Sequence, residues 1–270
     1  MFKNYTIFSL LITLFIAPNL YGKPALPLKE KSMLAATIAH FSYKNPHKTT
    51  KDGHKIYMDK DTKKEYKVVN EFTSDSGKYR AIALMDKDNN LFYSYRGTKG
   101  KGDVRTDAII ALNMPLSYLS QKTGKKLTIS NSLKKNTERS VNFYNDTLKK
   151  LDDAKIKHKS VLVTGHSLGG MMAQIVGHKT GAETHTFNAP GALIKGYFDK
   201  PGYTNNIINH VRSTDLIGNY GAHIGQVAHY NQSAKDGSFL KYPLNQHSVT
   251  YFKNDIKRGM TPKMYKHGKR

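Results

Sequence analysis

Apolar residues recur along the chain with two different periods, and these periods predict its secondary structure. Leu34, Ile38 and Phe41 repeat at helical spacing, which predicts an amphipathic helix over Ser32 to Tyr43. The polar segment after it predicts a loop. Three β-rich runs then follow, at Glu65 to Phe72, Lys78 to Met85 and Leu91 to Arg96. Short turn-forming segments separate these runs, so we expect an antiparallel meander.

Helical and strand patterns alternate through the second half of the chain. A helical pattern covers Leu133 to Asp153, and a short β-branched run at Ser160 to Thr164 precedes another apolar helical pattern. Two buried-looking strands follow, at Thr184 to Phe187 and Asn206 to Val211. This order predicts an α/β fold with a mostly parallel central sheet flanked by helices.

The N-terminus has the composition of an export signal. An apolar run from Tyr5 to Ala17 follows a single lysine and precedes a polar, small-residue zone that contains Gly22. This run has the length of a signal-peptide core and is too short to span a bilayer. We therefore predict a signal peptide over residues 1–22, export to the periplasm or the medium, and one α/β domain over residues 23–270.

Charge and cysteine content restrict the chemistry and the partners. The chain of 270 residues carries 43 Lys and Arg against 20 acidic residues, a formal net charge of +23, and no Cys. The absence of Cys excludes a disulfide, a thiol nucleophile and a Cys-based metal site. The charge favours contact with phosphate-bearing surfaces such as anionic lipid, and the alternative interpretation is a diffuse, solvated lysine-rich surface. Nothing beside the charge is typical of a specific nucleic-acid-binding motif.

The candidate nucleophile is Ser167, in the sequence Gly165-His166-Ser167-Leu168-Gly169. This pattern lies between a predicted strand and a predicted helix, which is the context of a nucleophile elbow. Flanking glycines leave room for the strand and the helix to approach closely on either side of the turn. The alternative interpretation is a glycine-rich turn with an incidental serine.

A serine hydroxyl needs a base to take its proton and an acid to hold that base in one tautomer. Asp215 follows a predicted strand, where a loop would present its carboxylate, and His247 comes later in the chain. Ser167, Asp215 and His247 thus appear in the chain order of α/β-hydrolases.

Other residues compete for the roles of acid and base. Asp199 also follows the serine but has no predicted strand before it, and His223 and His229 lie between Asp215 and His247. His166 is expected to brace the turn, because adjacent residues on a turn point apart. The histidine spacings contain no zinc-binding pattern, so we expect neither a metal nor another cofactor.

Five segments in this order resemble the class three lipases, the fungal-lipase-like branch of the α/β-hydrolases. They are Tyr95-Arg96-Gly97-Thr98, Gly165 to Gly170, Thr186 to Gly191, the Asp215 loop and His247. The resemblance implies an oxyanion hole formed at Thr98 and by the amide of Leu168. It places Phe187 to Gly191 in a core strand and turn beside the elbow. It also implies a mobile lid, for which Ala108 to Leu119 is a candidate, although a buried helix would have the same pattern.

The predicted function is therefore that of an exported serine ester hydrolase that acts on lipid esters. A phospholipase A is the first expectation, and a general lipase or short-chain esterase the second. Peripheral contact with an anionic membrane surface fits the charge. Two alternatives stay open: a non-catalytic lipid- or polyanion-binding protein on a hydrolase scaffold, and an acyltransferase that uses the same residues. The oligomeric state has no signal in the sequence.

Overall fold

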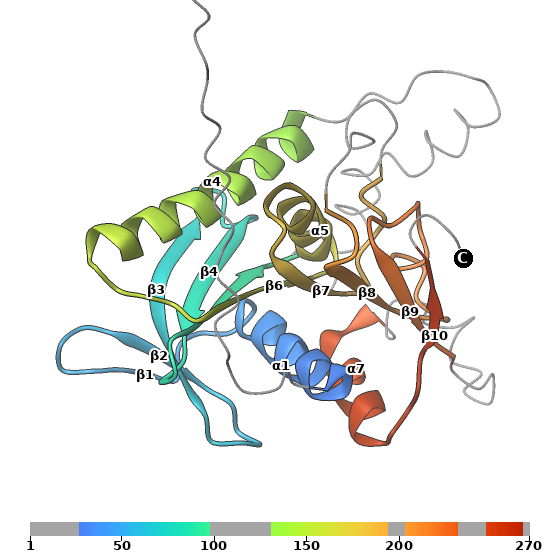
Figure 1. The fold of residues 1–270 in the computed structure, drawn as a ribbon, viewed down its shortest axis with the longest axis horizontal. Coiled ribbons are helices and arrows are strands. Elements are labelled where there is room, and N and C mark those ends of the chain that lie inside the picture. The colour runs from blue at the N-terminus through green and yellow to red at the C-terminus, as the bar shows by residue number, and fades with distance from the viewer. Residues whose placement is uncertain (1–26, 98–130, 194–202, 232–246, 267–270) are drawn as a thin grey trace, which may run out of the picture.

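The computed structural model describes residues 27–97, 131–193, 203–231 and 247–266. The predicted signal peptide, Thr98, the candidate lid Ala108 to Leu119 and the alternative acid Asp199 lie outside these residues. The described segments share one ten-stranded sheet, in which the strands lie side by side in chain order (Figure 1).

The first half of the sheet is antiparallel and confirms the predicted meander. Its strands are β1 (Lys48–Thr49), β2 (Lys55–Met58), β3 (Glu65–Thr73), β4 (Arg80–Met85) and β5 (Asn90–Tyr95). The prediction of a loop before β3 was wrong, because β1 and β2 form an edge hairpin there. These strands have two and four residues, too few for an alternating pattern to emerge from a polar segment.

The second half of the sheet is parallel from β5 to β9. Its strands are β6 (Ser160–His166), β7 (Glu183–Phe187), β8 (Ile207–Arg212) and β9 (Gln226–Tyr230), and β10 (Lys263–Tyr265) returns antiparallel to β9. The α/β prediction is confirmed, with parallel pairing confined to this half. Tight turns between β2 and β5 allow only antiparallel neighbours, since a parallel connection needs a crossover of a dozen or more residues.

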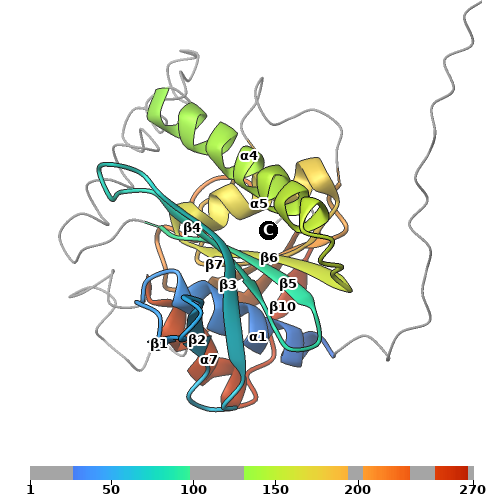
Figure 2. The ribbon, with the colours of Figure 1, turned by 90° about the vertical axis from the view of Figure 1, so that its left-hand side faces the viewer.

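Helices cover both faces of the sheet (Figures 1 and 2). On one face lie α4 (Asn131–Asp153) and α5 (Leu168–Thr180), and on the other lie α1 (Leu28–Phe41) and α7 (Val249–Lys257). The predicted first helix is confirmed but begins at Leu28 and ends at Phe41, which leaves Tyr43 just beyond it. The helix predicted from Leu133 begins at Asn131.

Two apolar cores fill the space between the sheet and these helices. One packs α4 and α5 against the sheet through side chains such as Phe143, Met171 and Ile175. The other packs α1 and α7 against the opposite face through Ile38 and Phe252. Burial on both faces explains why β6 is nearly continuous in apolar and β-branched residues. No helix within the described ranges is long and apolar enough to cross a membrane.

The carboxyl ends of the parallel strands meet at one edge of the sheet, where open α/β sheets bind their ligands. Gly97 follows β5 closely, Ser167 follows β6, Asn188 follows β7 and Asp215 lies in the loop after β8. The topology therefore gathers residues that are far apart in sequence.

Candidate active site

Ser167 occupies a strained turn between β6 and α5. Its φ of 59° and ψ of −135° lie on the side of the Ramachandran plot that favours glycine. Its N–H donates to the carbonyl of Phe187 at 3.1 Å, and its own carbonyl accepts from the N–H of Gly170 at 2.9 Å. The predicted strand, tight turn and helix are thus present, and neighbouring elements hold the strained backbone in place.

Close backbone contacts explain the glycines around Ser167. A Cβ added at Gly165 would lie 2.3 Å from the carbonyl oxygen of Gly169, and one added at Gly169 would lie 2.0 Å from that of Tyr95. A Cβ at Gly97 would lie 2.8 Å from the Cβ of Ser167. Only residues without side chains allow β5, β6 and α5 to approach this closely.

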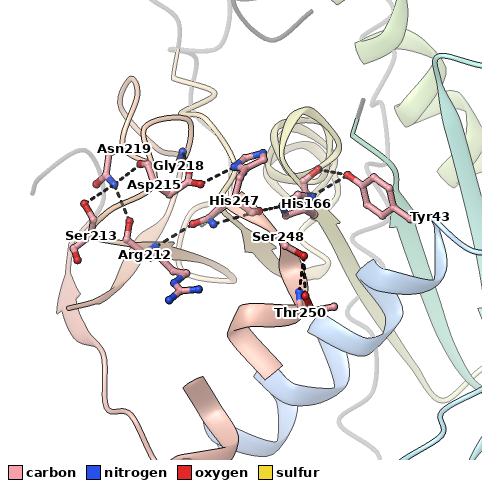
Figure 3. Close-up of polar contacts among 12 residues, drawn as sticks. Tyr43, His166, Arg212, Ser213, Asp215, Gly218, Asn219, His247, Ser248 and Thr250 are labelled. Carbon is pink, nitrogen blue, oxygen red and sulfur yellow. Dashed lines mark hydrogen bonds and ion pairs between the residues drawn. The ribbon is translucent and has the colours of Figure 1, made fainter. Parts of the chain in front are cut away.

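Asp215 and His247 are brought together by the fold, as Figure 3 shows. Nδ1 of His247 lies 2.7 Å from Oδ2 of Asp215, and both side chains are buried. The other carboxylate oxygen accepts from the backbone N–H of Gly218. Because the carboxylate accepts at Nδ1, this nitrogen carries the proton and Nε2 presents a lone pair.

Two buried polar atoms of the predicted triad have no hydrogen-bond partner within the described ranges. Among the described residues, neither Oγ of Ser167 nor Nε2 of His247 makes a hydrogen bond. Leaving a buried polar atom unpaired costs about 1–3 kcal/mol, so such atoms call for an explanation. The ring of His247 lies against that of His166, the residue before Ser167, with 4.7 Å between the ring centroids.

The predicted oxyanion donors are partly described. Leu168 is the first residue of α5, so its N–H has no partner within the helix and lies at the positive end of the helix dipole. This is where a developing negative charge next to Ser167 would be stabilised. Thr98 lies outside the described residues, but Gly97, which precedes it, donates its N–H to the hydroxyl of Tyr43 at 2.9 Å.

The alternative bases have other partners. Nε2 of His223 lies 2.8 Å from the carbonyl oxygen of Ala189. Nε2 of His229 lies 3.2 Å from Oδ1 of Asn219, and its Nδ1 lies 3.2 Å from Oδ1 of Asn231. The carboxylate of Asp215 bonds His247 instead.

His166 braces the turn, as predicted. Its Nδ1 lies 2.9 Å from the hydroxyl of Tyr43, and its Nε2 bonds the backbone carbonyl of His247. Burial, and secondarily the neighbouring His247, hold the pKa of His166 well below its usual value, so the ring is neutral. In the described part of the chain, no cluster of three or more His, Asp or Glu side chains could hold a metal ion.

Sequence reasoning missed Tyr43, and it gave Asn188 only as part of the structural strand and turn from Phe187 to Gly191. Tyr43 reaches the site from beyond the end of α1, and Asn188, at a φ of 43°, accepts the N–H of Arg212 at 3.0 Å. The amide of Asn188 also donates to the carbonyl of His247 at 3.5 Å. Asn188 lies in a family motif, which could have drawn attention to it, whereas no local pattern marks Tyr43.

Comparison of the sequence with known protein families finds a match that includes the Ser167 elbow. Residues 92–186, from β5 through β7 and the elbow, match the family model described as "Lipase (class 3)". Over these residues the chain is similar to the class 3, fungal-lipase-like family. The resemblance seen in the motifs is thereby confirmed.

Individual relatives match either a smaller part of this chain or most of it at low sequence identity. A protein of Vanderwaltozyma polyspora named "Putative lipase ATG15" is 31% identical over 80 residues, which are 28% of this chain and 13% of that protein. This chain thus matches only a small part of that relative. The crystal structure of a triacylglycerol lipase from Penicillium expansum superposes with a TM-score of 0.50 at 12% identity, covering 75% of this chain and 79% of that one. That likeness shows the α/β-hydrolase fold.

Proposed function

We propose that this protein is an exported serine carboxylic-ester hydrolase that acts on lipid esters. Ser167 would be the nucleophile, His247 the base and Asp215 the residue that orients the base. One observation carries the proposal: within the described part of the chain, the buried hydroxyl of Ser167 and Nε2 of His247 have no hydrogen-bond partner, while Asp215 holds the other nitrogen of His247 at 2.7 Å. A scaffold that needed these groups only for packing would satisfy them.

The reaction follows from these atoms. The hydroxyl oxygen of Ser167 attacks the ester carbonyl carbon while its proton passes to Nε2 of His247. The tetrahedral intermediate then collapses to an acyl-enzyme, and the alcohol leaves with the proton from His247. Water repeats the sequence on the acyl-enzyme, releases the fatty acid and restores Ser167. Asp215 keeps Nδ1 protonated throughout and stabilises the imidazolium that forms twice in each cycle.

The oxyanion of each intermediate would be held by the N–H of Leu168 and by a donor at Thr98. Backbone N–H groups fixed in advance contribute about 10²–10³ in rate for each donor. The position of Leu168 at the start of α5 supports its role. The role of Thr98 rests on the family resemblance.

The proposed substrate class rests on the similarity to class 3 lipases and on charge. Both relatives described above are named as lipases, which favours a lipid ester. A net charge of +23 favours anionic phospholipid over neutral triacylglycerol, because it concentrates the protein at an anionic surface. We therefore propose a phospholipase A that makes peripheral contact with anionic membranes after cleavage of residues 1–22.

Purified protein of residues 23–270 tests this proposal. Fatty-acid release would be measured from anionic phospholipid vesicles, from triacylglycerol and from a short-chain ester, each beside Ser167→Ala. Release from the vesicles that disappears in the variant is the expected result. Turnover of the short-chain ester alone would support an esterase and contradict the proposed phospholipase activity. No turnover of any substrate, with tight vesicle binding by both proteins, would indicate a non-catalytic binding scaffold.

A further inference from the structure

A chain of hydrogen bonds runs through Tyr43 and connects three separate parts of the site (Figure 3). The N–H of Gly97 lies 2.9 Å from the hydroxyl of Tyr43, and that hydroxyl lies 2.9 Å from Nδ1 of His166. Nε2 of His166 continues the chain to the backbone carbonyl of His247. The triad proposed above uses neither Tyr43 nor the side chain of His166.

Only one arrangement of protons satisfies all three bonds. The carbonyl of His247 can only accept, so Nε2 of His166 carries the proton. Nδ1 of the neutral ring is then an acceptor, and the hydroxyl of Tyr43 donates to it. The oxygen of Tyr43 is left to accept the N–H of Gly97. Burial raises the pKa of Tyr43, which keeps this hydroxyl protonated across the neutral range.

The segments joined in this way must keep a fixed spacing during acyl transfer. Gly97 precedes Thr98, the proposed oxyanion donor, His166 precedes Ser167, and His247 is the proposed base. The fit is tight, because a Cβ added at Gly97 would lie 2.6 Å from the hydroxyl of Tyr43 and 2.7 Å from the carbonyl of His166. One hydroxyl group from beyond α1 thus contacts both Gly97 and the elbow residue His166.

We propose that Tyr43 is a positioning residue that acts directly on the backbone of Gly97, and through His166 on the backbone of His247, to fix both relative to Ser167. This inference rests on the proposed ester hydrolase function. It assigns to the segment after α1 a part in the reaction without contact to the substrate. Misplacement of catalytic groups by fractions of an ångström lowers the rate of the chemical step more than it weakens substrate binding.

The first test compares Tyr43→Phe with Tyr79→Phe on a soluble short-chain ester. Tyr79 is a matched control, because its buried hydroxyl bonds Oγ of Ser140 at 2.9 Å in a contact between β4 and α4. We expect similar losses of about 2–4 °C in Tm for the two variants. In Tyr43→Phe, kcat should fall by about 10- to 100-fold with KM within twofold. Tyr79→Phe should keep the wild-type kcat. An unchanged kcat in Tyr43→Phe would overturn the proposal.

A double-mutant cycle tests the route through His166. In His166→Gln the side-chain amide keeps a donor for the carbonyl of His247 but loses the ring nitrogen that accepts from Tyr43. If the two residues act as one chain, Tyr43→Phe should lower kcat little further in the His166→Gln background. Additive effects on kcat would contradict the chain.

A third measurement does not depend on activity. In ¹⁵N-histidine-labelled Ser167→Ala, NMR at neutral pH should show His166 neutral and protonated at Nε2. Adding Tyr43→Phe should shift the proton that His247 donates to Asp215. A His166 protonated at Nδ1, or an unmoved His247 signal, would refute the positioning role. If wild-type protein hydrolyses no ester, the proposed function fails while this measurement still decides the hydrogen-bond chain.

Discussion

Two buried histidine clusters lie beside the parallel half of the sheet, and they differ in one respect. His210, on β8, uses both ring nitrogens: Nε2 lies 3.0 Å from Nδ1 of His185, and Nδ1 lies 3.1 Å from the hydroxyl of Tyr230. His247 uses only Nδ1, which Asp215 holds, and its Nε2 has no partner among the described residues. Both histidines are buried.

This difference separates the packed cluster of Glu183, His185, His210 and Tyr230 from the candidate catalytic cluster of Asp215 and His247. The ring of His210 stacks on Phe187 with 4.9 Å between centroids, and burial holds its pKa well below the usual value. Such a histidine contributes shape and hydrogen bonds but has no free nitrogen to take a proton. Burial and hydrogen bonding alone therefore do not mark a catalytic histidine. What distinguishes His247 is that Asp215 holds one ring nitrogen while the other has no partner among the described residues.

The largest expected effect comes from removing the unsatisfied hydroxyl. Ser167→Ala should lower kcat for ester hydrolysis by about 10³–10⁶. Its Tm should stay within about 2 °C of wild type, because Oγ makes no hydrogen bond to any residue that the structure describes. Kinetics and thermal unfolding of the same preparations test both expectations. Hydrolysis that persists in the variant would show that the unsatisfied atoms do not identify the nucleophile.

Replacing the carboxylate of Asp215, which accepts the proton of Nδ1 of His247, should give the next largest loss of activity. Asp215→Asn keeps the size of the side chain but favours a proton on Nε2 of His247, which can then no longer accept one from Ser167. We expect kcat to fall by about 10⁴. Single-turnover measurement of acyl-enzyme formation would locate the loss in the first chemical step. An activity close to that of wild type would assign the orienting role to another acid, with Asp199 the alternative from the sequence.

The elbow could be predicted from the sequence because the strand and helix patterns and the candidate nucleophile lie in one short segment. A β-branched run, glycines on both sides of Ser167 and an apolar helix all lie within about twenty residues. Chain order and the predicted strand ending at Val211 then led to Asp215 and His247. The oxyanion donors and lid came only from the resemblance.

Structural features that depend on contacts between residues far apart in sequence could not be predicted. The strands β1, β2, β9 and β10 are short, and pairing with neighbours rather than an alternating pattern defines them. Tyr43 lies 123 residues from His166 in sequence, so no local pattern connects the two. A polar contact of this kind emerges only from the packed fold.

Burial of the packed cluster should also make the stability of the protein depend on pH. Burial lowers the pKa of His210, whereas the unfolded chain protonates this residue near pH 6.5. The unfolded state therefore binds more protons below pH 6.5, and the free energy of unfolding falls with acidification. The slope is up to about 1.4 kcal/mol per pH unit for each such histidine. Denaturant unfolding between pH 5 and 8 measures this slope.

Two variants test whether His210 in the packed cluster causes this pH dependence of the free energy of unfolding. His210→Phe should be less stable than wild type at pH 8, because Tyr230 loses its partner, but should lose less stability on acidification. His158→Gln, which changes an exposed histidine, is the control and should keep the wild-type slope. Identical slopes for His210→Phe and wild type would show that His210 is already protonated in the folded state.

The smallest effect is expected at the exposed end of the packed cluster. Glu183 lies 2.8 Å from Nζ of Lys31 and 3.6 Å from Nε2 of His185. Hydrogen bonds from His185 and Lys31 outweigh burial and lower the pKa of Glu183 to about 2. The stabilisation is thus present above pH 4.5 and is lost as the pH falls toward 2. Because the carboxylate is 42% exposed, solvent screening limits the cost of Glu183→Gln to below about 1 kcal/mol. We expect a slightly lower Tm at pH 7 with unchanged kcat. A tenfold loss of kcat would mean that the packed cluster takes part in the reaction, and the distinction between the two histidine clusters would fail.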